Sequence, residues 1–383
     1  MSEDSSTRIL FIHNTIMWYR IPFFRALSDI YSVKYLFNHP DISQTLYGVK
    51  TQGEIDGMEG VNYTLLTNHL GVAWGLTGAV WGDYQVLVGG SWDSIPEIME
   101  SIYCFSVSWL RRKPVILWRE DWGWEDKSLK SRFLKPFIKW MVQTASAVMV
   151  PGTKHQEYFL DLGAKPEKTF IMPNVSNQTV QEHEPEDITQ LKGMENLSGK
   201  RIVLYVGRLI ERKGVQYLIQ AIKMSKTEDV VLLIVGSGEY EDELKSMVRK
   251  LGLENRVIFT GNVSQDELVS YYLQSDLVVI PSITLGIGDP WVLVLNEAMY
   301  YKKPVVATDA VGAASDMILE GENGFTVPEK DASALQEAID RIMEDDDLRS
   351  KMGQRSFQII QEGFCYPNMV EGFQKAVNYV LGK

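Results

Sequence analysis

The sequence contains few cysteines and no long apolar run. Of its 383 residues, the two cysteines, Cys104 and Cys365, lie far apart and outside any metal-binding spacing. This argues against a disulfide framework or a cysteine zinc site. No run of about 18 apolar residues is present, so we expect no membrane span. The first residues, MSEDSSTR, are polar and acidic, unlike a signal peptide. Together these absences predict a cytoplasmic protein.

Two common nucleotide-binding motifs are also missing. The first apolar run, residues 8–13, continues into Asn14-Thr15-Ile16-Met17 without a glycine. A dinucleotide-binding domain would have G-x-G-x-x-G at this point. The phosphate-binding pattern GxxxxGK[ST] does not occur in the sequence either. These absences argue against an NAD-type enzyme and against a P-loop NTPase.

The charge is negative overall but unevenly placed. The net charge is −12; residues 1–170 carry 17 Lys and Arg against 18 Asp and Glu, whereas residues 171–383 carry 21 against 32. Within the first part, residues 103–155 are basic, with 10 Lys and Arg against 4 acidic residues. We therefore expect no nucleic-acid partner, although a local basic surface remains open.

Apolar runs alternate with helical patterns along the chain, which is typical of parallel α/β sheets. The length fits two domains. We predict a domain over residues 1–175, a polar linker over 176–200, a second domain over 201–362 and a C-terminal helix over 363–383. Residues 39–82 are expected to be irregular. The predicted fold class is α/β, with two doubly wound Rossmann-like domains facing across a cleft.

The stretch from Ile280 to Asp309 carries the strongest local signal in the second half. A strand leads into a Gly-rich loop, and Asp289-Pro290 is typical of a helix N-cap and first helical residue. A helix start of this kind can bind an anion such as phosphate. If one helix holds both Asp289 and Glu297, these acids lie about 12 Å apart along its axis. That separation is too large for a paired-carboxylate hydrolase, which needs roughly 5–9.5 Å. The two acids could instead hold two ends of one long ligand.

Two further loops follow strands of the second half. One holds Arg208 and Lys213, two cations that could neutralise a diphosphate. The other runs from Gly236 to Glu239 and would let the backbone approach a ligand closely. With the helix start, these cations predict a site that stabilises a diphosphate leaving group.

Charged and aromatic residues follow a strand of the first half. The run Trp118-Arg119-Glu120-Asp121-Trp122 suits sugar binding, because aromatic faces stack on sugars and carboxylates accept hydroxyl hydrogen bonds. The alternative is a charged loop whose tryptophans cover the core. His13, at the end of the first strand, is a candidate ligand contact or a histidine satisfied by the backbone. Residues 127–142 form a basic amphipathic pattern interrupted by Pro136, which predicts either peripheral contact with an anionic membrane or a solvated basic face.

Several motifs of the second half resemble one known family. They are Gly207-Arg208-Leu209 with Lys213-Gly214, Val235-Gly236-Ser237-Gly238, Phe259-Thr260-Gly261, and Asp289-Pro290-Trp291 with Asn296-Glu297-Ala298-Met299 and Pro304-Val305-Val306. This set resembles the group 1 (family 4) nucleotide-sugar glycosyltransferases. The resemblance is strong over about 200–330 and weaker over 8–175. It implies the two-domain GT-B fold, with acceptor binding in the first domain, donor binding in the second, and a C-terminal helix crossing back to the first.

The resemblance also implies a retaining transfer of a sugar from a nucleoside-diphosphate sugar to a glycan or lipid-linked acceptor, as in polysaccharide biosynthesis. Arg208 and Lys213 would bind the diphosphate, Asp289 the transferred sugar, and Glu297 the ribose hydroxyls. The implied donor-binding residues are Gly207, Gly236, Gly238, Gly261, Val263, Pro290, Trp291, Val292, Leu293 and Glu297. The residues expected on the acceptor side are His13, Asn14, Trp118, Arg119 and Asp121, with Glu120 as an acceptor contact or base. No metal and no cofactor are expected, and the acidic run Asp345-Asp346-Asp347 is expected to be solvated.

The sequence departs from the family pattern in three ways. Asp289 stands where the family has Glu, and Val292 where it often has Gly. Arg119-Glu120-Asp121 occupies the region in which a histidine is often found. The alternatives are therefore a nucleotide-sugar epimerase of the same fold, or a non-catalytic nucleotide-sugar-binding protein.

Overall fold

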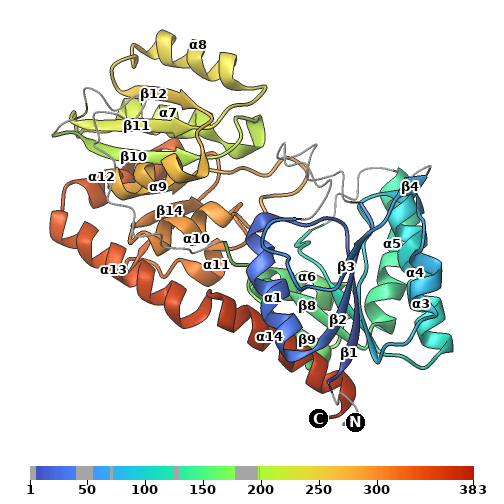
Figure 1. Ribbon diagram of the computed structural model, residues 1–383. Helices are drawn as coiled ribbons and strands as arrows, with labels where there is room; N and C mark the ends of the chain where they lie inside the picture. The colour runs from blue at the N-terminus through green and yellow to red at the C-terminus, as the bar shows by residue number, and fades with distance from the viewer. Residues whose placement is uncertain (1–5, 40–54, 70–71, 124–128, 177–196, 198) are drawn as a thin grey trace. The chain divides into compact units, whose positions relative to one another are not determined.

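A computed structural model describes residues 6–39, 55–69, 72–123, 129–176, 197 and 199–383 (Figure 1). The predicted linker 176–200 lies almost entirely outside these residues, as do parts of 39–82 and 127–142. The chain divides into two compact units. The first unit comprises Met1–Asn177 together with Cys365–Lys383, and the second comprises Gln178–Phe364.

The first unit is built on a seven-stranded parallel sheet in the order β3-β2-β1-β6-β7-β8-β9. Its strands are β1 (Arg8–His13), β2 (Ser32–Phe37), β3 (Tyr63–Leu65), β6 (Val86–Gly89), β7 (Val115–Trp118), β8 (Ala147–Val150) and β9 (Thr169–Ile171). The runs in β6, β7 and β8 are buried throughout, as expected for strands covered on both faces. The strand order reverses between β1 and β6, and ligands of such sheets bind beyond the carboxyl ends at this point.

Helices cover both faces of this sheet. They are α1 (Ile21–Ile30), α3 (Leu76–Val80), α4 (Ile95–Leu110), α5 (Leu129–Thr144), α6 (Thr153–Asp161) and α14 (Tyr366–Leu381). Helices α1 and α14 bury Phe23, Phe24 and Phe373 on one face, and α4 and α5 bury Phe105 and Met141 on the other. Helix α5 runs through Pro136, where we expected an interruption. The expectation of irregular structure over 39–82 is wrong in part, because β3, α3 and the small pair β4 (Asn68–His69) and β5 (Val72–Ala73) lie there.

The second unit has a six-stranded parallel sheet in the order β12-β11-β10-β13-β14-β15. Its strands are β10 (Arg201–Val206), β11 (Val230–Val235), β12 (Val257–Gly261), β13 (Leu277–Ile280), β14 (Val305–Thr308) and β15 (Gly324–Val327). Its helices are α7 (Val215–Met224), α8 (Glu241–Leu251), α9 (Gln265–Gln274), α10 (Leu293–Tyr300), α11 (Ala314–Met317), α12 (Ala332–Met343) and α13 (Asp346–Gly363). Here the order reverses between β10 and β13.

Both units are therefore doubly wound α/β sheets, which confirms the predicted α/β class with two Rossmann-like domains. The apolar run over residues 8–13 coincides with β1. Among the described residues, no helix is both long and apolar enough to cross a bilayer.

Candidate functional site: a carboxylate held by two cations in the second unit

Two loops meet where the strand order of the second unit reverses. The loop after β10 forms a 3-10 turn, Glu211–Lys213, and Gly214 leads into α7. The loop after β13 lies against it, because the Ile283 N–H donates to the Arg212 carbonyl at 2.8 Å. Gly214 has a φ of 69°, and a Cβ there would lie 1.8 Å from the Pro281 carbonyl oxygen. A glycine is thus required for the two loops to meet.

Asp289 lies at this junction and is buried, with 5% of its surface exposed. One carboxylate oxygen accepts from Arg212 Nη1 at 3.0 Å. The other accepts from Lys213 Nζ at 2.5 Å and from Ser282 Oγ at 2.9 Å. Burial alone would raise the pKa of Asp289, but the ammonium of Lys213 and the guanidinium of Arg212 outweigh it and lower the pKa. The side chain is therefore a fixed carboxylate at the carboxyl ends of β10 and β13.

The prediction that Asp289 caps a helix is wrong. Helix α10 begins at Leu293 with Val292 as its N-cap. The backbone of Asp289 is instead tied to the segment after β14, since its N–H donates to Ala310 and its carbonyl accepts from Gly312, both at 2.8 Å. These bonds hold Asp289 outside the helix. Pro290 is consequently not the first helical residue, and the separation of about 12 Å estimated along one helix axis does not apply.

Glu297 lies within α10 and is half-buried. Its carboxylate accepts a hydrogen bond from the Tyr272 hydroxyl at 2.7 Å. Burial raises the pKa of Glu297 to about 7, and the Tyr272 hydrogen bond opposes this rise. No cation is among the groups that shift its pKa. Asp289 and Glu297 therefore sit in different environments: the first is held ionised, and the second changes charge near neutral pH.

The remaining donor-side residues fall into two groups. The glycines join neighbouring loops: a Cβ on Gly236 would lie 2.0 Å from the Gly207 oxygen, and one on Gly238 would lie 2.3 Å from the Leu209 oxygen. Gly236 also forms an isolated bridge with Gly261. These glycines bring the loops after β10, β11 and β12 together, whereas we expected the close approach to be to a ligand.

The other group comprises residues at the start of α10 and after β12. Val292 is 7% exposed and packs in the core, so only its backbone is available to a ligand. Trp291 is half-buried and its Nε1 donates to Asn296 Oδ1 at 3.1 Å. Leu293 and Val263 are both half-buried. The Arg208 carbonyl accepts from the buried Tyr205 hydroxyl at 3.0 Å, which fixes the backbone at this residue. The Arg208 side chain is exposed, so its guanidinium can reach a ligand.

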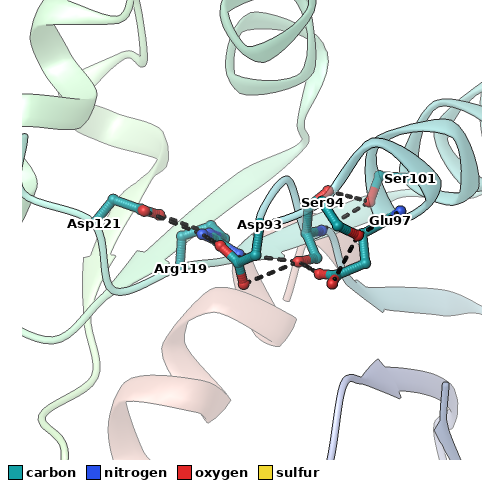
Figure 2. A network of polar contacts seen from close by, with 7 residues as sticks. Asp93, Ser94, Glu97, Ser101, Arg119 and Asp121 are labelled. Atoms are coloured by element: carbon teal, nitrogen blue, oxygen red, sulfur yellow. Dashed lines mark hydrogen bonds and ion pairs between the residues drawn. The ribbon is translucent and has the colours of Figure 1, made fainter. Parts of the chain in front are cut away.

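In the first unit, a polar network follows β6 and β7, two adjacent strands (Figure 2). Arg119 donates to Asp121 Oδ2 at 2.6 Å and to Asp93 Oδ1 at 2.7 Å. It also donates to Ser91 Oγ at 3.2 Å and lies 4.4 Å over the Trp92 ring. Burial would raise the pKa of Asp93, yet the Arg119 guanidinium lowers it. The structure thus brings together Arg119, Asp121 and the segment Gly89-Gly90-Ser91 at the end of β6.

A second cluster lies at the ends of β1 and β7. The buried guanidinium of Arg20 forms an ion pair with Glu120 and lies 4.4 Å over the Trp118 ring. Burial and the nearby Arg20 lower the pKa of His13 to about 3, so the imidazole is neutral. Its Nδ1 lies 2.9 Å from the Thr15 carbonyl, so the histidine is satisfied by the backbone. Asn14 accepts from the Thr15 N–H at 2.8 Å.

The structure contradicts a stacking role for Trp118. Its ring is 6% exposed and packs against Phe11 and Phe23 in the core, because the last residue of β7 points into the sheet face covered by α1 and α14. Of the tryptophans that follow β7, Trp122 is half-buried and Trp124 lies outside the described residues. Glu120 is neutralised by Arg20, and this pairing holds the pKa of Glu120 below its usual range despite burial.

Residues of these clusters that were not singled out from the sequence include Arg20, Asp93, Arg212 and Ser282. Arg212 directly precedes Lys213 in the same turn, and that adjacency was an available signal. The sequence offered no such signal for Arg20 and Asp93, because their partners are distant in sequence. Arg20 pairs with Glu120, 100 residues away, and Asp93 with Arg119, 26 residues away. Within the described part of the chain, no group of three His, Cys, Asp or Glu side chains is arranged to hold a metal ion.

The chain is similar to a known family model, to curated proteins and to solved structures. Residues 187–358 match the family model of the glycosyl transferases group 1. An uncharacterized glycosyltransferase of Methanocaldococcus jannaschii is 32% identical over 45% of this chain and 43% of its own. The alpha-D-kanosaminyltransferase of Streptomyces kanamyceticus is 27% identical over 60% of each chain. The chain thus spans about half the length of the curated relatives it matches. The structure of Anabaena Alr3699/HepE in complex with UDP superposes with a TM-score of 0.78 at 20% identity, covering 97% of this chain and all of that one.

The fold is that of the GT-B glycosyltransferases. Residues 187–358, which match the group 1 glycosyl transferase model, include the motifs on which the resemblance to that family was based.

Proposed function

We propose that the chain is a retaining glycosyltransferase that moves a sugar from a nucleoside-diphosphate sugar to a glycan or lipid-linked acceptor, as in polysaccharide biosynthesis. The observation that carries the proposal is the buried Asp289 carboxylate between Arg212 and Lys213, inside the family-matched segment. UDP-sugars are the first donors to test, since the structural neighbour was solved with UDP.

The proposed roles follow from charge and position. Arg208, exposed beside the junction, and Lys213 would hold the diphosphate, and Asp289 would accept hydrogen bonds from the transferred sugar. Lys213 would then lie between two anions, a carboxylate and the leaving diphosphate. Preformed cations of this kind stabilise charge that grows as a bond breaks. Arg212 positions Asp289 and keeps it ionised when Lys213 is engaged.

In the proposed reaction the bond between the anomeric carbon and the diphosphate oxygen breaks, and the pair of electrons leaves with the diphosphate. The acceptor oxygen bonds to the same face of the anomeric carbon and loses its proton to the departing phosphate oxygen. Glu120 remains a candidate acceptor contact, although its ion pair with Arg20 makes a base role less suited to it than in the sequence-based hypothesis. We propose that no metal or cofactor is required, so chelation with EDTA should leave turnover unchanged.

A thermal-shift screen with UDP, GDP and ADP and their sugars identifies the donor class, because a ligand that binds only the folded state raises the melting temperature. Release of nucleoside diphosphate is then measured for the wild type, Lys213→Ala and the exposed control Lys250→Ala. We expect the turnover rate of Lys213→Ala to be lower than that of the wild type by a factor of roughly one hundred or more. The turnover rate of the control should be unchanged.

Two outcomes would favour the alternatives. Nucleoside-diphosphate binding without release from any donor would indicate the non-catalytic protein. Conversion of the donor into an isomeric sugar without an acceptor would indicate the epimerase. The anomeric configuration of a transferred product, read by NMR, tests retention.

A further inference from the structure

Helix α4 buries one set of apolar residues in the core and exposes a second set to solvent, while both of its glutamates are buried. Its four most exposed apolar side chains are Ile95, Met99, Trp109 and Leu110, which are 53%, 63%, 79% and 65% exposed. All of α4 lies in the described residues, and none of its exposed positions is charged. A surface helix of a water-soluble domain has the opposite arrangement, with polar residues on its solvent side.

The inward carboxylates fix the helix in this orientation. Glu100 accepts from Asn38 Nδ2 at 2.7 Å and from the Ala73 N–H at 2.6 Å. Glu97 accepts from the Ser91 hydroxyl and from Ser94 Oγ, the N-cap of the helix. Rotating α4 to hide its apolar face would break the bonds to Asn38, Ala73 and Ser91. The exposed apolar residues are therefore a stable feature of the folded unit.

Neighbouring helices extend the same surface, and α3, α4 and α5 lie side by side (Figure 1). Trp81, directly after α3, is 53% exposed, and its Nε1 donates to the Tyr103 hydroxyl of α4 at 2.9 Å. On α5, Phe137 and Trp140 are 48% and 37% exposed, and the Trp140 ring lies 6.2 Å from Phe105 of α4. We call the α4 face the set Trp81, Ile95, Met99, Trp109, Leu110, Phe137 and Trp140.

Cations border the α4 face. Arg111, Arg112 and Lys113 follow Leu110 directly. Arg111 donates to the carbonyls of Val80 and Gly82 and so fixes this corner, while Arg112 is exposed. Lys139, next to Trp140, is exposed as well. Trp109, Leu110, Phe137 and Trp140 of the face lie in the segment 103–155, which carries 10 basic and 4 acidic residues in a chain of net charge −12.

We propose that the α4 face docks on the surface of a bilayer that contains anionic lipid. Tryptophan and tyrosine favour the boundary between water and hydrocarbon, and exposed Lys and Arg beside them are attracted to anionic headgroups. A second copy of the chain fits this surface less well, since a symmetric dimer would press one cation-bordered face against another face of the same charge. In this proposal α4 supplies most of the apolar contact and α5 adds Phe137 and Trp140. Docking of this kind does not depend on the transferase activity.

Flotation of the full chain with vesicles tests the proposal. Vesicles of phosphatidylcholine alone are compared with vesicles in which half of the lipid is phosphatidylglycerol. We expect binding to the anionic vesicles that weakens as salt is added, because the attraction between exposed charges is screened. Trp109→Ser should lower the partition coefficient by roughly tenfold.

Two matched pairs of variants distinguish binding through the α4 face from non-specific binding to lipid. Met99→Gln is compared with Met224→Gln, a change at another exposed methionine, 48% exposed, in the second unit. Lys139→Gln is compared with Lys250→Gln, since both lysines are exposed on helices. The first member of each pair should weaken binding, and the second should not.

Absence of binding to anionic vesicles, or equal binding by Trp109→Ser and the wild type, would overturn the proposal. A second result would also overturn it: the wild type does not bind vesicles and forms a dimer in light scattering, and Trp109→Ser dissociates that dimer. Unchanged circular dichroism and melting temperature of the variants show that the fold is retained.

Discussion

Asp289 combines a structural and a proposed chemical role in one side chain. Its backbone bonds to Ala310 and Gly312 hold it in the loop, and its carboxylate takes up the charge of Arg212 and Lys213. An aspartate is one methylene shorter than the glutamate expected from the family pattern. Here the short side chain reaches both cations because the loops after β10 and β13 are in direct contact through Arg212 and Ile283.

Neutralising Asp289 should separate turnover from nucleotide binding. Asp289→Asn keeps the shape but removes the charge, so we expect a loss of roughly hundredfold in kcat. The affinity for nucleoside diphosphate should stay the same or rise, because Lys213 is released toward the phosphates. Glu297→Gln, by contrast, should weaken nucleotide affinity more than Asp289→Asn does, because a ribose hydroxyl loses its carboxylate acceptor. Steady-state kinetics and calorimetric titration with UDP measure both quantities, and equal nucleotide affinity in the wild type and both variants would contradict the assignment of Glu297.

Glu297 should make the stability of the protein depend on pH near neutrality. Burial raises its pKa from the usual 4.5 to about 7, so between these values the folded state holds a proton that the unfolded state has lost. The free energy of unfolding therefore falls as the pH rises through this range, by roughly 3 kcal/mol from this one group. Urea unfolding at several pH values should show that Glu297→Gln removes this part of the dependence, whereas the exposed control Glu254→Gln retains it. The same slope in all three proteins would exclude a raised pKa at Glu297.

The sequence identified the charged residues of the second unit's site more readily than the residues that pair with them. Lys213, Asp289 and Glu297 could be selected because their spacing follows a motif. Ser282 and Arg212 could not be given their role, because it depends on one loop folding over another. Trp118 was misjudged since a strand-end tryptophan can point either to the sheet face or to solvent, and the alternation of β7 directs it into the core.

Among the structural elements, the loops after parallel strands determine the shape of the second unit's site. The alternation of apolar runs and helical patterns predicted most strands and helices, because buried parallel strands are continuous apolar runs. It missed β15 and β3, which are four and three residues long, and it placed α10 too early. Short strands give too few residues for a period, and the start of α10 is set by tertiary hydrogen bonds of Asp289.

Gly236→Ala tests whether loop contact or ligand approach requires this glycine. Its φ is 129°, and the added Cβ would lie 2.0 Å from the Gly207 oxygen, so the loops after β10 and β11 must separate. We expect a loss of roughly 2 kcal/mol or more in the free energy of unfolding, measured with urea and without any ligand present. Gly252→Ala is the matched control: its φ is 65° with nothing within 4 Å of the new Cβ, so only about 1 kcal/mol of backbone strain should appear. If both variants lower the free energy of unfolding by the same amount, steric contact between the loops is not the reason for a glycine at position 236.

At the scale of the whole molecule, the chain leaves the first unit near Asn177 and returns to it at Cys365. Helix α14 therefore belongs to the unit that begins the chain, and its side chains complete a core with residues of β1, α1, β7 and β8. Phe373 is fully buried and its ring lies 5.9 Å from those of both Phe11 and Phe23. Composition and periodicity could predict a terminal helix, but not which sheet it covers, because its apolar stripe would suit either unit.

Phe373→Ala should destabilise the two units unequally. The variant leaves a cavity between α14, α1 and β1, which costs about 3–5 kcal/mol in a well-packed core. That cost acts on the first unit, since every ring that contacts Phe373 lies there. Hydrogen exchange read by mass spectrometry should show lost protection in β1 and α1 and unchanged protection in β10 and α7. Tyr379→Ala, on the same helix but 41% exposed, serves as the control and should change neither. Equal losses in both units would mean that they unfold together, and the C-terminal helix would then stabilise the whole chain and not the first unit alone.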